Sequence, residues 1–239
     1  MKRLMLLTAI AAMTACGGGG GGSNTTAPVN GTAEGFWNGT ITGGYSASVA
    51  ILENGETWGA YSSGNSLVGA IYGQTSSSDA SLSGSGSFFN FVRRQSGAGT
   101  YTGSVSPKST INFTTNGGDR FTGNYSATYD QPASLASLAG SYSGFSVTGT
   151  TSAQSTPIVI SSTGAISGVA LGCTATGTAK PRASGKNIFD VQLSFSGTCA
   201  LGNGASTSGI AYYDVTTRQV GVITLNSSKT DGLIYLGTR

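Results

Sequence analysis

The sequence predicts an all-β protein made of two tandem antiparallel up-and-down meanders, in the form of two small eight-stranded β-barrels. The first observation is that apolar and polar residues alternate in short runs from residue 35 onward, which is typical of strands with one buried face. The second is that Asn-Gly and Asp-Gly pairs, such as Asn54-Gly55 and Asp231-Gly232, separate these runs and favour tight hairpins. The third is an internal repeat that divides the chain into two halves.

The composition excludes several other classes of protein. The chain has 239 residues, of which 39 are glycine. Charged residues make up only 9% of the chain, and histidine is absent from the sequence. Strong helix formers are too scarce for a helical bundle, and a hydrophobic content of 38% is too high for a disordered chain. The formal net charge of +3 gives no basic footprint, so we expect no nucleic-acid partner.

Residues 1–15 have the organisation of a secretory signal peptide. Lys2 and Arg3 precede an apolar stretch at residues 4–13. This stretch is too short to cross a bilayer as a helix, which takes about 20 residues. The sequence therefore predicts export and removal of this segment.

The next feature is the sequence Met13-Thr14-Ala15-Cys16, which resembles the lipobox of bacterial lipoproteins. The resemblance implies cleavage before Cys16 and acylation of the Cys16 thiol, so that membrane lipid is one partner of the protein. Met13 departs from the family pattern, which prefers Leu or Val at this position.

Residues 16–34 are expected to form a lipidated, glycine-rich tether. Six consecutive glycines follow Cys16, and a flexible chain of this length spans roughly 25 Å. Glycine rather than aspartate at position 17 resembles the sorting pattern for the outer membrane. This resemblance implies a lipid-anchored outer-membrane protein, facing either the cell surface or the periplasm.

The remaining chain is expected to contain a β-domain at 35–130, a linker at 131–139 and a second β-domain at 140–239. Each domain begins with the pattern Gly-x-aromatic-x-Gly, and its aromatic residues, Trp37 and Tyr142, are expected to fill the two barrels. One sixteen-stranded structure is the alternative topology. The expected strands lie near 35–43, 46–52, 57–62, 67–74, 80–92, 99–105, 109–115, 120–129, 140–149, 157–161, 165–170, 172–179, 187–195, 206–214, 218–225 and 231–237.

Cys173 and Cys199 remain as an even pair once Cys16 is lipidated. An exported compartment is oxidising, so we expect a disulfide between them. Two free buried thiols are the alternative.

The overall organisation resembles the surface lipoproteins of Gram-negative bacteria, in particular the transferrin-binding protein B and factor H-binding protein group. The shared features are Cys16, the polyglycine tether and glycine-rich β-domains. The resemblance implies presentation of β-domains at the envelope. No ligand-contact motif of that group can be matched to residues of this sequence.

Catalytic chemistry is not expected. Without histidine, Ser-His-Asp and Cys-His mechanisms are excluded, and no nucleophile elbow or phosphate-binding loop occurs. We therefore expect no enzyme activity, no catalytic residue, no metal site and no cofactor.

The most unusual segment is residues 88–94, Phe-Phe-Asn-Phe-Val-Arg-Arg. Continuous apolar residues indicate a strand buried on both faces, or an exposed patch used for recognition. Phe91, Arg93 and Arg94 are therefore candidate binding residues, since guanidinium groups bind carboxylates. Tyr213 is a further candidate binding residue. Tyr212 and Tyr213 are consecutive in the sequence, and one of the two can face outward from a strand.

These features together favour a non-catalytic, lipid-anchored envelope protein that presents β-domains to a protein or glycan ligand. The alternatives are a periplasmic structural or envelope-assembly lipoprotein and an inhibitor of a hydrolase. The sequence alone does not identify the ligand.

Overall fold

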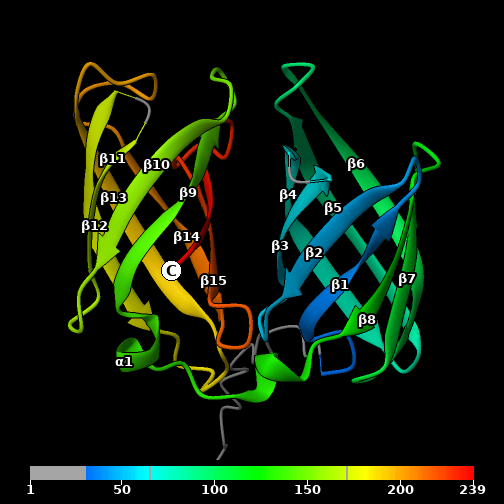
Figure 1. The fold of residues 1–239 in the computed structure, drawn as a ribbon. Helices are drawn as coiled ribbons and strands as arrows, with labels where there is room; N and C mark the ends of the chain where they lie inside the picture. The colour runs from blue at the N-terminus through cyan, green and yellow to red at the C-terminus, as the bar shows by residue number, and fades with distance from the viewer. Residues whose placement is uncertain (1–30, 65, 171) are drawn as a thin grey trace, which may run out of the picture.

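The computed structural model describes residues 31–64, 66–170 and 172–239, which form two closed antiparallel β-barrels lying side by side (Figure 1). In each barrel every strand pairs with its neighbours in sequence, and the eighth strand returns to pair with the first. The predicted fold class is confirmed, and the single sixteen-stranded alternative is wrong because each meander closes on itself.

Barrel 1 is formed by the first eight strands. They are β1 (Gly35–Ile41), β2 (Tyr45–Ile51), β3 (Glu56–Ser63), β4 (Ser66–Ser78), β5 (Ser81–Asn90), β6 (Gln95–Ser106), β7 (Thr110–Thr115) and β8 (Arg120–Tyr125). Barrel 2 is formed by the last eight. They are β9 (Gly140–Thr148), β10 (Gln154–Ile160), β11 (Ala165–Ala170), β12 (Cys173–Pro181), β13 (Phe189–Gly197), β14 (Ser206–Asp214), β15 (Gln219–Leu225) and β16 (Gly232–Thr238).

Two short helices connect the barrels at one end of the molecule (Figure 1). The first is the 3₁₀ helix η1 (Ala127–Asp130), and the second is the single α-helical turn α1 (Leu135–Leu138). The side chain of Ser134 caps α1 by accepting a hydrogen bond from the backbone N–H of Ser137, as expected for serine at this position.

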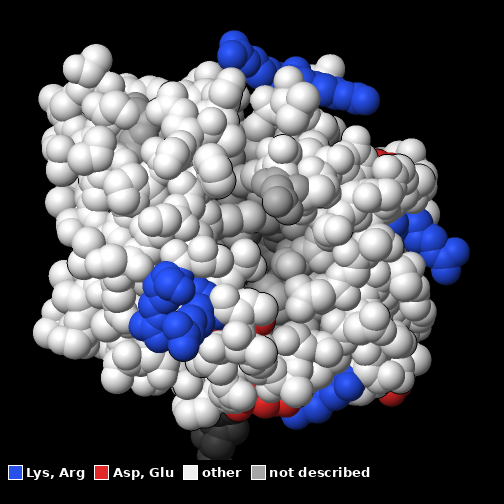
Figure 2. Space-filling model, in the orientation of Figure 1, with Lys and Arg blue, Asp and Glu red and all other residues white. Residues whose placement is uncertain are grey.

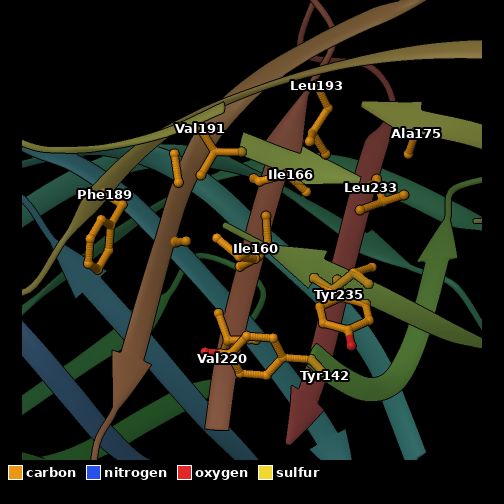
Figure 3. Packing of buried hydrophobic residues seen from close by; sticks show 14 of the residues in the cluster. Tyr142, Ile160, Ile166, Ala175, Phe189, Val191, Leu193, Val220, Leu233 and Tyr235 are labelled. Atoms are coloured by element: carbon orange, nitrogen blue, oxygen red, sulfur yellow. The ribbon is translucent and has the colours of Figure 1, made fainter. Parts of the chain in front are cut away.

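Each barrel is filled by aromatic and aliphatic side chains. Trp37 and Tyr142 are 0% and 1% exposed, as the repeat predicts. Each side chain donates a hydrogen bond to the backbone carbonyl four residues earlier: Trp37 Nε1 to Ala33 O at 3.1 Å, and Tyr142 Oη to Leu138 O at 2.5 Å. Figure 3 shows the packed interior of barrel 2.

Pairs of glycines close both barrels. Gly39 on β1 lies opposite Gly123 on β8, and Gly144 on β9 lies opposite Gly237 on β16. A Cβ on Gly39 would lie 1.9 Å from the carbonyl oxygen of Thr122, and one on Gly144 would lie 2.1 Å from that of Leu236. Only glycine therefore allows the first and last strands to approach this closely.

The barrels dock through apolar outer faces, on β1–β5 of barrel 1 and on β9 and β14–β16 of barrel 2. Where the barrels meet, these strands carry apolar side chains on both sides, because one set fills the barrel and the other contacts the neighbouring barrel. The buried residues shared between the barrels are Ala50, Leu52, Trp58, Leu67, Ala70, Phe89, Tyr129, Val147, Ile188, Ile210, Tyr212, Ile223, Leu225 and Ile234.

Two expected boundaries need correction. The predicted tether extends to residue 34, but residues 31–34 pack on barrel 1. Ala33 is fully buried and its N–H donates to Ser77 Oγ, and Glu34 accepts a hydrogen bond from Tyr129 Oη. The strand predicted at 80–92 ends at Asn90, and residues 91–94 form the turn to β6.

The predicted disulfide between Cys173 and Cys199 is confirmed. Their Cα atoms are 4.8 Å apart, and the bond joins the start of β12 to the loop that follows β13. Cys173 is buried and belongs to the core of barrel 2, while Cys199 packs against that core. The bond therefore closes a loop that contains a complete strand pair.

Candidate functional site

A groove of about 110 Å³ lies between the barrels, where the surface is hollowed (Figure 2). Barrel 1 contributes outward side chains of β1–β3, and barrel 2 contributes those of β14–β16. The lining residues are Phe36, Asn38, Ser48, Ala50, Trp58, Ala60, Ile210, Tyr212, Asp214, Gln219, Gly221, Ile223 and Leu236. Barrel 2 holds a smaller, apolar interior cavity of about 30 Å³, which has room for little more than water.

Three aromatic residues form the apolar floor of the groove. The rings of Phe36 and Tyr212 stack across the two barrels, with centroids 3.7 Å apart and planes within 4°. Trp58 lies on β3 and contacts Tyr72 edge-on at 4.6 Å between centroids. Trp58 is 2% exposed, and its indole Nε1 has no hydrogen-bond partner among the described residues. A buried donor without a partner is costly, and this N–H is an unsatisfied donor at the interface beside the groove.

Strand alternation explains why these side chains face the groove. Successive residues on a strand point to opposite faces. Because Trp37 fills barrel 1, Phe36 points outward, and because Tyr213 fills barrel 2, Tyr212 points outward.

Polar side chains from both barrels form the rim. Ser48 Oγ donates to Asn38 Oδ1 at 2.7 Å on the barrel 1 side. On the barrel 2 side, Asp214 Oδ1 accepts hydrogen bonds from the backbone N–H groups of Thr216 and Thr217, which holds the carboxylate at the end of β14. Gln219 lies directly opposite Asp214 on β15.

Lys229 from the β15–β16 turn covers the aromatic pair beside the groove. Its Nζ lies 4.9 Å from the ring centroid of Tyr72 and 5.4 Å from that of Trp58. This is the distance range of cation–π contacts, and it ties barrel 2 to β3 and β4 of barrel 1.

Arg182 makes a second connection between the barrels. It lies in the loop between β12 and β13, and its guanidinium contacts Glu53 of barrel 1 at 2.9 Å and Asp190 of barrel 2 at 2.6 Å. Burial lowers the pKa of Arg182, but hydrogen bonds to Asp190 and Glu53 raise it overall. A planar guanidinium suits this bridging position because it donates in several directions at once.

The linker supplies a third connection. Hydrogen bonds from Lys108 and Lys186 lower the pKa of Asp130 to about 2. The hydroxyl groups of Thr128 and Tyr212 also hydrogen-bond to each other. These contacts join η1 to both barrels, so the walls of the groove are fixed relative to one another.

The binding residues expected from the sequence lie elsewhere. Arg93 and Arg94 are exposed in the β5–β6 turn, while Phe91 packs against the cluster between the barrels. Tyr213 is 2% exposed inside barrel 2, where its ring contacts Tyr142 edge-on. The expectation that Tyr213 faces outward is therefore wrong, because Tyr212 takes the outward position on this strand.

The rest of residues 88–94 is divided between core and surface. Phe89 is buried against barrel 2, whereas Phe88 and Val92 are 45% and 71% exposed. The structure thus brings Phe91, Arg93 and Arg94 together in one turn, but it does not bring Tyr213 to them. Cys16 lies outside the described residues.

Sequence reasoning did not identify Phe36, Trp58 or Tyr212 as groove residues. A signal for the docking faces is present in segments such as Leu233-Ile-Tyr-Leu236 and Ile210-Ala-Tyr-Tyr213, which are apolar without alternation. In a small barrel that pattern indicates an outer face covered by another element.

In residues 31–64, 66–170 and 172–239 no group of three or more His, Cys, Asp and Glu side chains could hold a metal ion. The helices described in these ranges are too short to cross a membrane.

No known family model matches the chain, and no curated protein does. Among solved structures, one similar chain is described as a "putative outer membrane protein" from Bacteroides fragilis, with 15% identity, a TM-score of 0.25, and coverage of 86% of this chain and 96% of that one. A second is a protein of unknown function from the DUF3598 family of Nostoc punctiforme, with 12% identity, a TM-score of 0.29, and coverage of 89% and 98%. At these TM-scores neither likeness supports an argument about this protein.

Proposed function

We propose that this protein is a non-catalytic binding protein, anchored by lipid in the outer membrane, whose docked barrels present a groove to a glycan or protein ligand. The observation that carries the proposal is the groove, with an aromatic floor and a polar rim contributed by both barrels. Ligand sites are commonly concave and mostly apolar, with a few polar groups that orient the ligand.

Preorganisation supports a binding role. The Phe36–Tyr212 stack, the Lys229 contact with Trp58 and the Arg182 bridge to Glu53 all join the two walls. A preformed site avoids the entropic cost of ordering its walls when the ligand binds.

Lipid anchoring is tested by replacing Cys16. The lipobox-like residues that end at Cys16 support attachment through acyl chains, which hold a protein on a membrane without a spanning segment. The Cys16→Ala protein is expected to move from the membrane fraction to the soluble fraction of the cell. A Cys173→Ala/Cys199→Ala protein is the matched control and should stay with the membrane. Membrane retention of the Cys16→Ala protein would remove this part of the proposal. Protease treatment of intact cells then distinguishes a surface from a periplasmic location.

Binding through the groove is tested with Gly221→Leu. Gly221 lines the groove, and a Cβ there would meet only Leu236, at 3.4 Å, so the larger side chain occupies the groove with little strain on the fold. We expect this variant to lose binding to the ligands that wild-type protein retains from a panel of immobilised glycans and purified extracellular proteins. Gly117→Leu is the control, because Gly117 lies in the β7–β8 turn outside the groove and a Cβ there would make only an ordinary contact with Thr115 Oγ1 at 3.6 Å. Equal binding by wild-type and Gly221→Leu protein would contradict the assignment.

A further inference from the structure

The charge of the groove restricts its ligand. Asp214 is the one acidic side chain among the lining residues, and no lysine or arginine lines the groove. Lys229 lies beside the groove, but it is not a lining residue, and its ammonium group lies over the rings of Tyr72 and Trp58. Figure 2 shows mainly uncharged surface around the hollow. A phosphate, sulfate or carboxylate would find no cationic partner in the lining, so the groove favours an uncharged ligand.

The aromatic floor favours a ligand with an apolar face. Tyr212 and Trp58 are 8% and 2% exposed, whereas Phe36 is half-buried, so C–H groups of a ligand can pack on the exposed part of the Phe36 ring. A ligand that suits the floor therefore has an apolar C–H face.

The rim favours a ligand with several hydroxyl groups. Asn38 and Gln219 carry amides that both donate and accept, Ser48 carries a hydroxyl, and Asp214 accepts only. Hydroxyl groups can donate to a carboxylate and accept from an amide, so a ring with adjacent hydroxyls matches this set. The groove is also of the right size: about 110 Å³ accommodates roughly eight to ten water-sized groups, which is close to one six-membered sugar ring.

From these features we propose that the groove binds one neutral pyranose residue of a glycan, with its C–H face on the aromatic floor and its hydroxyls on the rim. This inference rests on the proposed function, of which it specifies the ligand class. Asn38 and Ser48 of barrel 1 and Asp214 and Gln219 of barrel 2 hold the sugar from opposite sides.

The two tryptophans provide a direct measurement. Trp37 Nε1 is hydrogen-bonded to Ala33 O inside barrel 1, whereas Trp58 lines the groove and its buried Nε1 has no hydrogen-bond partner among the described residues. In the mature protein labelled with ¹⁵N-tryptophan, two indole signals are expected, and a Trp58→Phe variant assigns them. Titration with the methyl glycosides of glucose, galactose, mannose and N-acetylglucosamine should shift the Trp58 signal with at least one of them. The Trp37 signal should stay in place.

Variants test whether the shift comes from the groove. Ser48→Ala should weaken sugar binding several-fold and Asn38→Ala by about tenfold, as expected for the loss of ligand hydrogen bonds. Ser46→Ala is the matched control, because Ser46 is exposed on the same strand and does not line the groove. It should bind the sugar as wild-type protein does. Gly221→Leu should abolish the shift.

The outcomes separate this inference from the proposed function. If no neutral glycoside moves the Trp58 signal, or if only glucuronic acid or N-acetylneuraminic acid does, the inference is wrong. If a panel ligand nevertheless binds wild-type but not Gly221→Leu protein, the groove remains the site and only the ligand class fails. If panel ligands bind both proteins equally, the groove itself is not the binding site.

Discussion

Replacing Gly39 by alanine is expected to prevent barrel 1 from closing and to destabilise it by about 3 kcal/mol or more. The new Cβ would lie 1.9 Å from the carbonyl oxygen of Thr122 and 2.6 Å from the Cα of Gly123. Both are backbone atoms of β8, so relief requires the separation of β1 from β8. Urea unfolding measures the loss, with fluorescence of Trp37, which lies inside this barrel, as the signal.

The control for this prediction is Gly221→Ala. Its Cβ would make an ordinary contact with Leu236 at 3.4 Å, so the unfolding midpoint should remain close to that of wild-type protein. Equal midpoints for the Gly39→Ala and Gly221→Ala proteins would show that close approach at the β1–β8 pair does not limit barrel closure.

Removal of the disulfide by Cys173→Ser/Cys199→Ser is expected to destabilise barrel 2 by about 3.5 kcal/mol, since the bond closes a loop over a sequence separation of 26. Hydrogen exchange followed by mass spectrometry measures the effect in β12 and β13, the two strands inside that loop. Peptides from these strands should lose protection by a larger factor than peptides from β5 and β6 of barrel 1.

Chemical reduction provides the independent comparison for the disulfide. Reduced wild-type protein should exchange at the same rate as the double serine variant in β12 and β13. If oxidised and reduced protein exchange equally, the bond does not contribute to the stability of barrel 2.

The barrels were predictable from the sequence because their determinants are local. Alternating residues define the strands, turn glycines define the hairpins, and the matching positions of Trp37 and Tyr142 define the two interiors. The same local reasoning identified Cys173 and Cys199, since an even pair of cysteines in a chain expected to be exported favours a disulfide. Each of these inferences needs only neighbouring residues or simple counting.

The groove was not predictable because it depends on how the barrels dock. Tyr212 and Tyr213 are adjacent and must face opposite sides, but the sequence does not state which side is the interior. The stack of Phe36 on Tyr212 joins β1 to β14, and the bridge from Arg182 to Glu53 joins two loops of different barrels. The loss of alternation at residues 210–213 and 233–236 indicates that an outer face is covered, but it does not identify the segment that covers it.

The docking faces of the two barrels are different from each other, although the barrels share one plan. Barrel 1 docks through β1–β5, which are its first five strands. Barrel 2 docks through β9, its first strand, and β14–β16, its last three strands. A contact between unlike faces of similar subunits can repeat without closing, and it then produces filaments. The faces left free carry hydroxyl, amide and charged side chains, such as Thr102 and Ser104 on β6 and Gln192 and Ser194 on β13. Polar side chains on these strands disfavour a repeat of the barrel-to-barrel contact between molecules.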